Sequence, residues 1–355
     1  MKGKIALLLA IVAAYFFNQF SVQLGIDPYT NKVLNVIAIN VLLAVAFNLV
    51  MGYTGQFSLG HAGFMAVGAY SASAFTMFFT RGTLHVMGTQ SWQAQGLFLC
   101  AMLLGGLVAA VAGLLVGVPS LRLKGDYLAI VTLGFGEIIR VVFVNMDAVG
   151  GPIGMSGIPK QTNLFWSLTM AFVTIYVVTA LVRSVYGSGF MVTRDDEVAA
   201  EAMGVNTTKY KVIAFVISAF FTGIAGALYA HLVRTITPDG FNFQKSVEIL
   251  VMVIFGGLGN VVGVIFAAIF LGWLNELLRD ASQWRMVIYA LLLIVIMILR
   301  PGGLLGTPVE IRRLLGKLGF RPKKTPPGSG PPTAGGQTSA SPIPEVQPAP
   351  EGGAS

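Results

Sequence analysis

The chain has 355 residues, of which 55% are hydrophobic and only 11% are charged; its mean hydropathy is +0.76. Soluble globular domains carry about 25% charged residues, so the composition excludes an ordinary soluble domain. The net charge of +8 does not indicate nucleic-acid binding, because the basic residues stand at the ends of apolar segments and in the C-terminal tail.

The long apolar runs predict the fold class. Several reach the roughly 20 residues that an α-helix needs to cross a bilayer core. They are continuous rather than alternating, which argues against a β-barrel. We therefore expect an all-α polytopic membrane protein with about ten transmembrane or half-membrane helices. The apolar segments run over residues 5–22, 33–51, 62–79, 95–118, 126–146, 165–183, 211–233, 246–258, 261–278 and 285–300.

The first segment, in MKGKIALLLAIVAAYFF, follows a basic start and so resembles a secretory signal peptide. An uncleaved membrane span is the alternative. We favour the span, because no clear A-x-A cleavage site follows and further spans come after it.

A polar, glycine-rich stretch, GYTGQFSLGH, follows the second segment. It carries enough hydrogen-bond donors and acceptors to line a translocation path through the membrane. The same groups would equally satisfy an irregular backbone of their own. Both interpretations stay open for its candidate path residues, which are Tyr53, Gln56, Ser58 and His61.

Three carboxylates fall within apolar segments: Glu137, Glu248 and Glu276. A charged side chain at the bilayer centre costs about 2.5–3.5 kcal/mol on insertion scales, so these groups should face protein or water. Glu137 and Arg140 stand one helical turn apart and favour a structural ion pair. Glu137 and Glu248 remain candidates for the translocation path, together with Asn260.

A compact mixed-charge segment, GFMVTRDDEVAAEAMGVNTTKYK, interrupts the apolar sequence at residues 189–211. We expect Thr193 to cap a helix of about ten residues, with Asp196 in the acidic position of a capping box. Gly204 is a natural C-terminal stop, and Thr207 or Thr208 can begin the next span. A solvated loop is the alternative. The agreement of cap, stop and a small apolar face favours a docking helix.

The eighth and ninth segments, 246–258 and 261–278, are separated by FGGLGNVVG, whose glycines allow the chain to break. One continuous helix over 246–270 is the alternative. It would leave the basic C-terminal tail outside the cell, against the positive-inside rule. Ten segments with both termini in the cytoplasm are the better prediction, and they place the mixed-charge segment in the cytoplasm too.

The last part of the chain, at 318–355, is rich in Pro, Gly and Ser and has no apolar periodicity. We expect it to be a disordered tail whose first basic residues rest on anionic membrane lipid. Residues 1–317 would then form the transmembrane domain.

The sequence offers no machinery for enzyme chemistry. It has no P-loop and no G-x-S-x-G elbow, and its three histidines lack metal-ligand spacing. Cys100 is the only cysteine, so an intrachain disulfide is excluded. We expect neither a metal nor a cofactor in this chain.

Six motifs, in this order, are similar to those of the LivM-type permease subunits of branched-chain amino acid ABC importers. They extend over most of the chain, from about Lys32 to Gly306. The motifs are NLVMGYTGQFSLGHAGFMAVGAY, GDYLAIVTLGFGEIIR, GGPIGMSGIP, RDDEVAAEAMGVN, SVEILVMVIFGGLGNVVG and LRPGGLLG.

The resemblance implies an ABC importer permease architecture in the bacterial cytoplasmic (inner) membrane, with alternating access driven by ATP in a separate subunit. It implies ABC ATPase subunits, a second LivH-type permease and a periplasmic substrate-binding protein as partners. It also implies a cytoplasmic coupling loop at about 184–210. Glu201-Ala202-Met203-Gly204 matches the family's EAA…G pattern only in part. The candidate ATPase-coupling residues are Arg194, Asp195, Asp196, Glu197, Glu201 and Gly204.

Other functions are compatible with parts of the sequence. A permease of the same superfamily for urea, short amides or aromatic acids is the nearest alternative. A secondary transporter without an ATPase would need a coupling-ion site and would leave the mixed-charge segment without a purpose. An intramembrane enzyme and a purely structural scaffold are weaker candidates.

Overall fold

A computed structural model describes residues 2–83, 92–121 and 126–279, apart from residues 24 and 26, and the single positions 284, 287, 288, 291 and 294. The chain divides into two units, Met1–Arg313 and Leu314–Ser355. Every described residue belongs to the first unit. The predicted tail lies outside the described residues, as does most of the predicted segment at 285–300.

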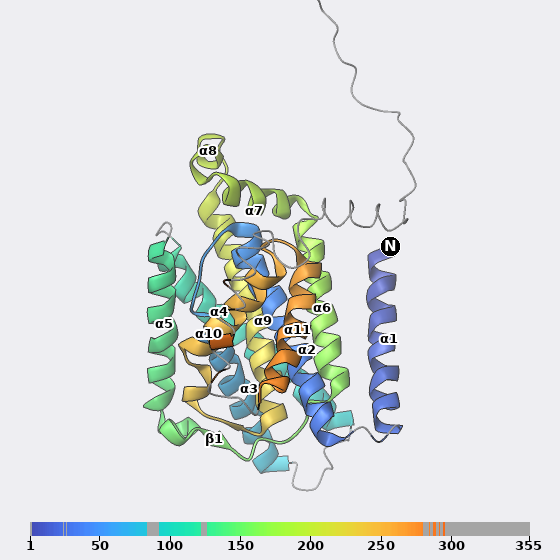
Figure 1. Cartoon of the computed structure of the whole chain (residues 1–355). Helices are drawn as coiled ribbons and strands as arrows, with labels where there is room; N and C mark the ends of the chain where they lie inside the picture. Colours follow the sequence, from blue (N-terminus) through green and yellow to red (C-terminus); the bar gives the residue numbers. More distant parts are fainter. Residues whose placement is uncertain are drawn as a thin grey trace, which may run out of the picture. The chain divides into compact units, whose positions relative to one another are not determined.

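The described part of the chain is built almost entirely of helices (Figure 1). This confirms the expected all-α polytopic class, because six of its helical stretches are long and apolar enough to cross a membrane. The helices are α1 (Lys2–Gln23), α2 (Pro28–Asn48), α3 (His61–Thr83), α4 (Trp92–Ser120), α5 (Asp126–Val144), α6 (Leu164–Val182), α7 (Val185–Asp195), α8 (Glu197–Ala202), α9 (Thr207–Val233), α10 (Phe243–Gly256) and α11 (Val261–Leu277).

Short elements connect these helices. A π-helical turn continues α2, and two short strands pair antiparallel, with Met155 opposite Ile236. The connecting elements are η1 (Leu49–Tyr53), η2 (Asp147–Val149), η3 (Gly151–Ile153), η4 (Pro238–Phe241), β1 (Met155–Ser156) and β2 (Thr235–Ile236).

The two ends of the helical bundle differ in structure. Helices α7 and α8 lie at one end, which we call the α8 end, and β1 lies at the other, the β1 end (Figure 1). At the β1 end, Arg140 of α5 donates to Glu137 at 2.7 Å and to Asp239 of η4 at 2.9 Å. The predicted Glu137–Arg140 pair is therefore confirmed, and it also joins α5 to the connection between α9 and α10.

Helices α2 and α9 form the centre of the bundle and are mostly buried, whereas few residues of α5 are fully buried. Helices α3, α4 and α9 approach each other through glycines. A Cβ atom added to Gly68 would lie 2.3 Å from Cα of Gly223, and one added to Gly105 would lie 2.8 Å from the oxygen of Gly68. Small residues permit such approach between membrane helices, so that backbones touch directly.

The segment at 246–270 is not a continuous helix. Helix α10 ends at Gly256, and the next three residues include two glycines with positive φ, Gly257 at 96° and Gly259 at 76°. Other residues rarely adopt this conformation. The glycines therefore end α10, and the prediction of two separate segments is confirmed.

Candidate functional site

The first break in the bundle separates α2 from α3, and we call residues 49–60 the first break. The π-helical turn η1 is followed by Gly55, which has a φ of 69°, and by a non-helical segment that ends at His61. Figure 1 draws this segment as the blue loop that descends from the α8 end into the bundle. Transmembrane chains tolerate such irregular backbone where it is surrounded by protein or lines a cavity.

Side chains from neighbouring helices hold the first break in place. Thr132 of α5 accepts a hydrogen bond from the backbone of Leu59 at 3.1 Å. Ser246 of α10 accepts one from the backbone of Ala62 at 3.2 Å. The side chain of Gln56 is buried. Its amide nitrogen donates to Thr54 at 2.7 Å, whereas its amide oxygen, Oε1, has no hydrogen-bond partner. The break is thus an ordered part of the core.

His61 is enclosed at the start of α3. Its Nε2 atom lies 3.0 Å from the hydroxyl of Ser218 in α9, and Ser218 in turn donates to the carbonyl oxygen of Ala46 in α2. Its ring contacts Phe47 with a centroid distance of 4.4 Å. Ser58 lies 3.5 Å from the other ring nitrogen. These contacts favour a role for His61 in joining three helices.

The second break, residues 257–260, separates α10 from α11 and touches the first. Asn260 caps α11 by accepting a hydrogen bond from the backbone of Gly263 at 3.2 Å. The side-chain oxygen of Asn48, at the end of α2, accepts one from the backbone of Gly259 at 3.0 Å. A Cβ atom on Gly52 would lie 2.3 Å from the nitrogen of Gly259. The two breaks therefore form one junction, which we call the break junction.

Sequence reasoning missed Asn48, although an asparagine inside the apolar run LNVIAINVLLAVAFNLV is a usable signal. Asn40 and Asn48 are both buried, and the amide nitrogen of each lacks a hydrogen-bond partner. Asn40 lines a cavity between α2 and α11. Helix α2 thus presents amide groups both to α11 and to the second break, which precedes α11. Buried polar groups in membrane helices usually mark pathways or functional contacts.

Helix α8 is shorter than expected, and its cap is Asp196 rather than Thr193. Asp196 has extended backbone angles and accepts hydrogen bonds from the backbones of Val198 and Ala199, both at 3.0 Å. Thr193 lies inside α7 and donates to the carbonyl of Gly189. The prediction of one ten-residue helix capped by Thr193 was wrong, because the chain forms α7 first and Asp196 breaks it before α8.

The predicted stop at Gly204 is confirmed. Gly204 has a φ of 81° and donates to the carbonyl of Glu201, while Val205 donates to that of Ala200. This pair of bonds is a Schellman motif, which satisfies the free carbonyls of the helix end. Helix α9 then begins at Thr207, with Asn206 as its cap.

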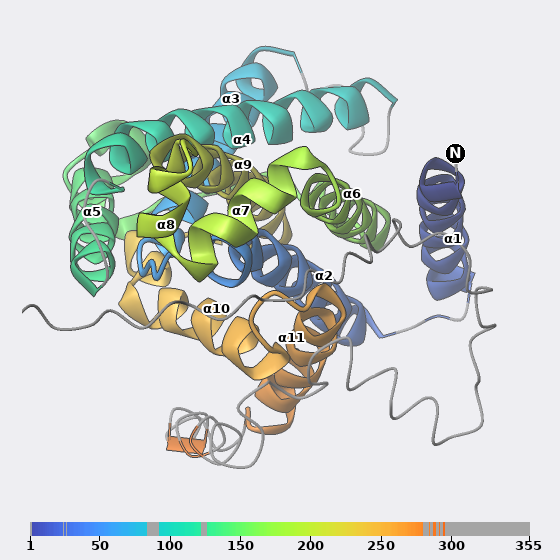
Figure 2. The same cartoon turned by 90° about the horizontal axis from the view of Figure 1, so that it is seen from above.

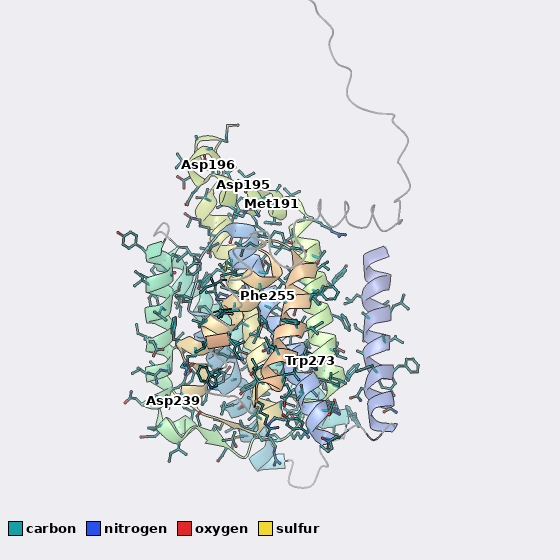
Figure 3. All side chains as sticks on the ribbon, viewed as in Figure 1. Met191, Asp195, Asp196, Asp239, Phe255 and Trp273 are labelled. Carbon is teal, nitrogen blue, oxygen red and sulfur yellow. The ribbon has the colours of Figure 1, made fainter. Side chains whose placement is uncertain are left out.

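Two of the candidate coupling carboxylates bind α9. Glu197 forms an ion pair at 2.7 Å with Lys211, whose side chain is only 8% exposed. Glu201 accepts a hydrogen bond from Thr207 at 2.7 Å. They therefore fix α8 on α9, and much of the surface that α8 turns outward is apolar: Val198 is 69% exposed and Met203 84%. Figure 3 shows Asp195 and Asp196 at this end of the molecule.

Of the two remaining coupling candidates, Asp195 pairs with Arg194, and Arg194 contacts the break junction although 38% of its side chain is exposed. Its guanidinium group donates to Asp195 at 2.8 Å and to the carbonyl oxygen of Gly52 at 3.2 Å. The other two path candidates lie elsewhere: Glu248 pairs with Lys245 in the first turn of α10 at 3.0 Å, and Glu137 pairs with Arg140. The structure thus brings Arg194 to the first break and leaves the carboxylates of α5 and α10 in local ion pairs.

Comparison with known proteins identifies the family. Residues 29–299 match the model of the family described as branched-chain amino acid transport system / permease component. The chain belongs to this family. It is thus a membrane permease component, as its motifs predicted, and the match includes both breaks and the α7–α8 segment.

Individual relatives in this permease family agree. The high-affinity branched-chain amino acid transport system permease protein LivM of Escherichia coli K12 is 34% identical over 86% of this chain and 75% of its own. LivM of Salmonella typhimurium LT2 is 35% identical over 75% of this chain and 68% of its own. LivH of Escherichia coli K12 is 22% identical over 75% of this chain and 91% of its own. No solved structure matches.

Proposed function

We propose that this permease imports branched-chain or related hydrophobic amino acids through the bacterial inner membrane, driven by ABC ATPase subunits that bind its α7–α8 segment. The observation that carries the proposal is this segment: a capped helix, fixed to α9 and presenting an exposed apolar surface beyond the bundle. The names of the LivM and LivH relatives support the substrate class and a second, LivH-type permease as partner.

In this proposal the α8 end faces the cytoplasm, together with both termini. A periplasmic binding protein then delivers substrate at the β1 end, and ATP is bound by the partner subunit. Support comes from the charges at this end, because the basic residues Arg183, Arg194, Lys209 and Lys211 gather at the ends of α6, α7 and α9. Cytoplasmic ends of membrane helices carry an excess of such residues.

We propose that Val198 and Met203 supply the contact surface of the docking element, and that the coupling candidates other than Arg194 shape this element. Asp196 and Gly204 define the two ends of α8, and Glu197 and Glu201 attach it to α9. Exposed apolar side chains on a short rigid helix suit an anchor that enters a pocket of a partner protein. Anchors of this kind carry most of the free energy of binding at an interface.

The test is the double substitution Val198→Asp/Met203→Asp in the tagged full-length chain, co-expressed with its candidate ATPase and second permease and extracted in mild detergent. We expect the recovered ATPase to fall about tenfold or more, as for loss of interface anchors, with membrane insertion unchanged. The matched control is Ile153→Asp, because Ile153 is 84% exposed at the opposite end. Equal ATPase recovery from the double variant and the control would contradict the proposal.

A further inference from the structure

Arg194 joins α7 to the break junction. It is the second-last residue of α7, and its Nη1 atom donates to the carbonyl oxygen of Gly52 at 3.2 Å. On the other side, Nε and Nη2 donate to the carboxylate of Asp195 at 3.0 and 2.8 Å. One guanidinium group therefore holds the end of α7 and the backbone of the first break at the same time.

The glycines of both breaks face Arg194. A Cβ atom on Gly55 would lie 2.9 Å from Cγ of Arg194, and one on Gly259 would lie 3.4 Å from its Nη1. The stem of the side chain thus packs on the first break, and its charged head reaches the second. A side chain at Gly55 would push the arginine away. Three chain segments therefore meet at this side chain.

The chemistry at this position suits arginine. The carbonyls at the end of a helix have no intrahelical partner, and they carry the negative end of the helix dipole. Gly52 lies in the last turn of the helix that begins with α2. A planar guanidinium group offers several donors in a fixed fork, whereas a lysine ammonium is a flexible point charge. Arginine therefore binds a carbonyl and a carboxylate with a defined geometry.

The other contacts of the α7–α8 segment lead to different parts of the bundle. Glu197 and Glu201 attach α8 to the start of α9, which continues into the bundle as a long helix. Figure 2, which looks down on the α8 end, shows α7 running from the end of α6 toward α9. Arg194 connects this same α7 to the points where α2 and α10 end. A displacement of α7 would therefore act at a point where the backbone has glycines with positive φ.

We propose that Arg194 is a positioning residue that transmits movement of the α7–α8 segment to the two helix breaks. The inference rests on the proposed function, because it assumes that an ATPase moves this segment. The break junction is then the part of the permease that changes shape, and Arg194 couples it to ATP hydrolysis. If Arg194 only capped the helix end at Gly52, substituting it would affect stability alone.

The experiment uses the complete transporter, reconstituted in vesicles with its ATPase, second permease and binding protein. Three variants are compared with the unaltered complex: Arg194→Ala, Arg194→Lys and the control Lys209→Ala. Lys209 is an exposed cation at the same end of the molecule. The measurements are ATPase recovery, the rate of ATP hydrolysis, and the amount of labelled leucine imported per ATP hydrolysed.

We expect Arg194→Ala to keep ATPase recovery within about twofold and to lower leucine import per ATP by about tenfold, in the range of typical coupling energies. Arg194→Lys should restore import per ATP in part, because the ammonium group keeps the charge but loses the fork. Lys209→Ala should leave import per ATP unchanged. Because lysine retains the stabilising charge, Arg194→Lys gives the deciding comparison if the alanine variant folds poorly.

Three results would overturn the inference. Unchanged import per ATP in both Arg194 variants would show that the link carries no movement. Loss of ATPase recovery in them would assign Arg194 to the docking surface instead. A folded Arg194→Lys variant with normal import per ATP, beside an Arg194→Ala variant that does not fold, would show that the arginine acts only as a helix cap. Failure of the unaltered chain to bind any ATPase is a different result, because it contradicts the proposed function itself.

Discussion

Glycine serves opposite purposes in two regions of this permease. In the α3–α4–α9 contact, Gly68, Gly105 and Gly223 lie inside regular helices and allow backbones to touch. In the break junction, Gly55 and Gly259 adopt positive φ and end regular structure. The glycines of the first region keep side chains out of the close contact between helix backbones. The second group supplies backbone conformations that other residues rarely adopt.

The difference predicts how the two regions behave. Helix contacts through glycine join rigid elements along their length, so α3, α4 and α9 should move as a block. The break junction depends on a few hydrogen bonds, such as the one from Gly259 to Asn48, and its buried amide groups are partly unpaired. We expect such a junction to change shape more easily than the closely packed helices, because fewer hydrogen bonds hold it. A substitution should therefore affect stability in the first region and transport in the second.

The largest effect is expected for Gly68→Val. A Cβ atom at this position would lie 2.2 Å from the carbonyl oxygen of Gly223, and backbone atoms cannot move aside as a flexible side chain can. Overpacking should lower the free energy of unfolding by about 3 kcal/mol or more, measured by thermal denaturation in detergent. Gly134→Ala is the control, because a Cβ atom there has no neighbour within 4 Å. Equal stability of the two variants would contradict the expectation that α3, α4 and α9 form a rigid block.

A smaller loss of stability and a clear loss of transport are expected for Gly259→Ala. The left-handed conformation costs a residue with a side chain about 1–2 kcal/mol. The added methyl group would also approach the oxygen of Gly52 at 3.2 Å. Leucine uptake should fall more than the protein yield. Gly240→Ala is the control, because its nearest neighbour would lie at 3.8 Å and its φ is not positive. Full uptake by the Gly259 variant would argue against a moving junction.

The smallest effect is expected for the cap of α8. Asp196→Ala should destabilise this helix by about 1 kcal/mol, whereas Asp196→Asn should change it by only a few tenths. The two hydrogen bonds at 3.0 Å to Val198 and Ala199 would be lost in the alanine variant alone. Hydrogen exchange at these amides should then become about fivefold faster. Equal exchange in both variants would show that the cap does not hold α8.

Sequence patterns predicted the long helices well and the α7–α8 segment in part. Continuous apolar runs are a local property, and the glycines of FGGLGNVVG indicated the second break. The cap of α8 was misassigned because Thr193 and Asp196 are both suitable cap residues. The choice between them depends on α7, which continues through Thr193 before the chain turns. The sequence also did not reveal that Glu197 forms an ion pair within the chain, because its partner Lys211 lies beyond the next turn of the chain.

The sequence by itself determined the membrane class, most segment boundaries and the family, because each rests on composition, local periodicity or short motifs. Only the tertiary structure decided which polar groups meet. Arg194 and Gly52 are 142 residues apart, and Asn48 and Gly259 are 211 apart. Such contacts arise from the packing of whole helices, which sets positions that no local pattern encodes. The break junction and its arginine link are therefore properties of the folded bundle.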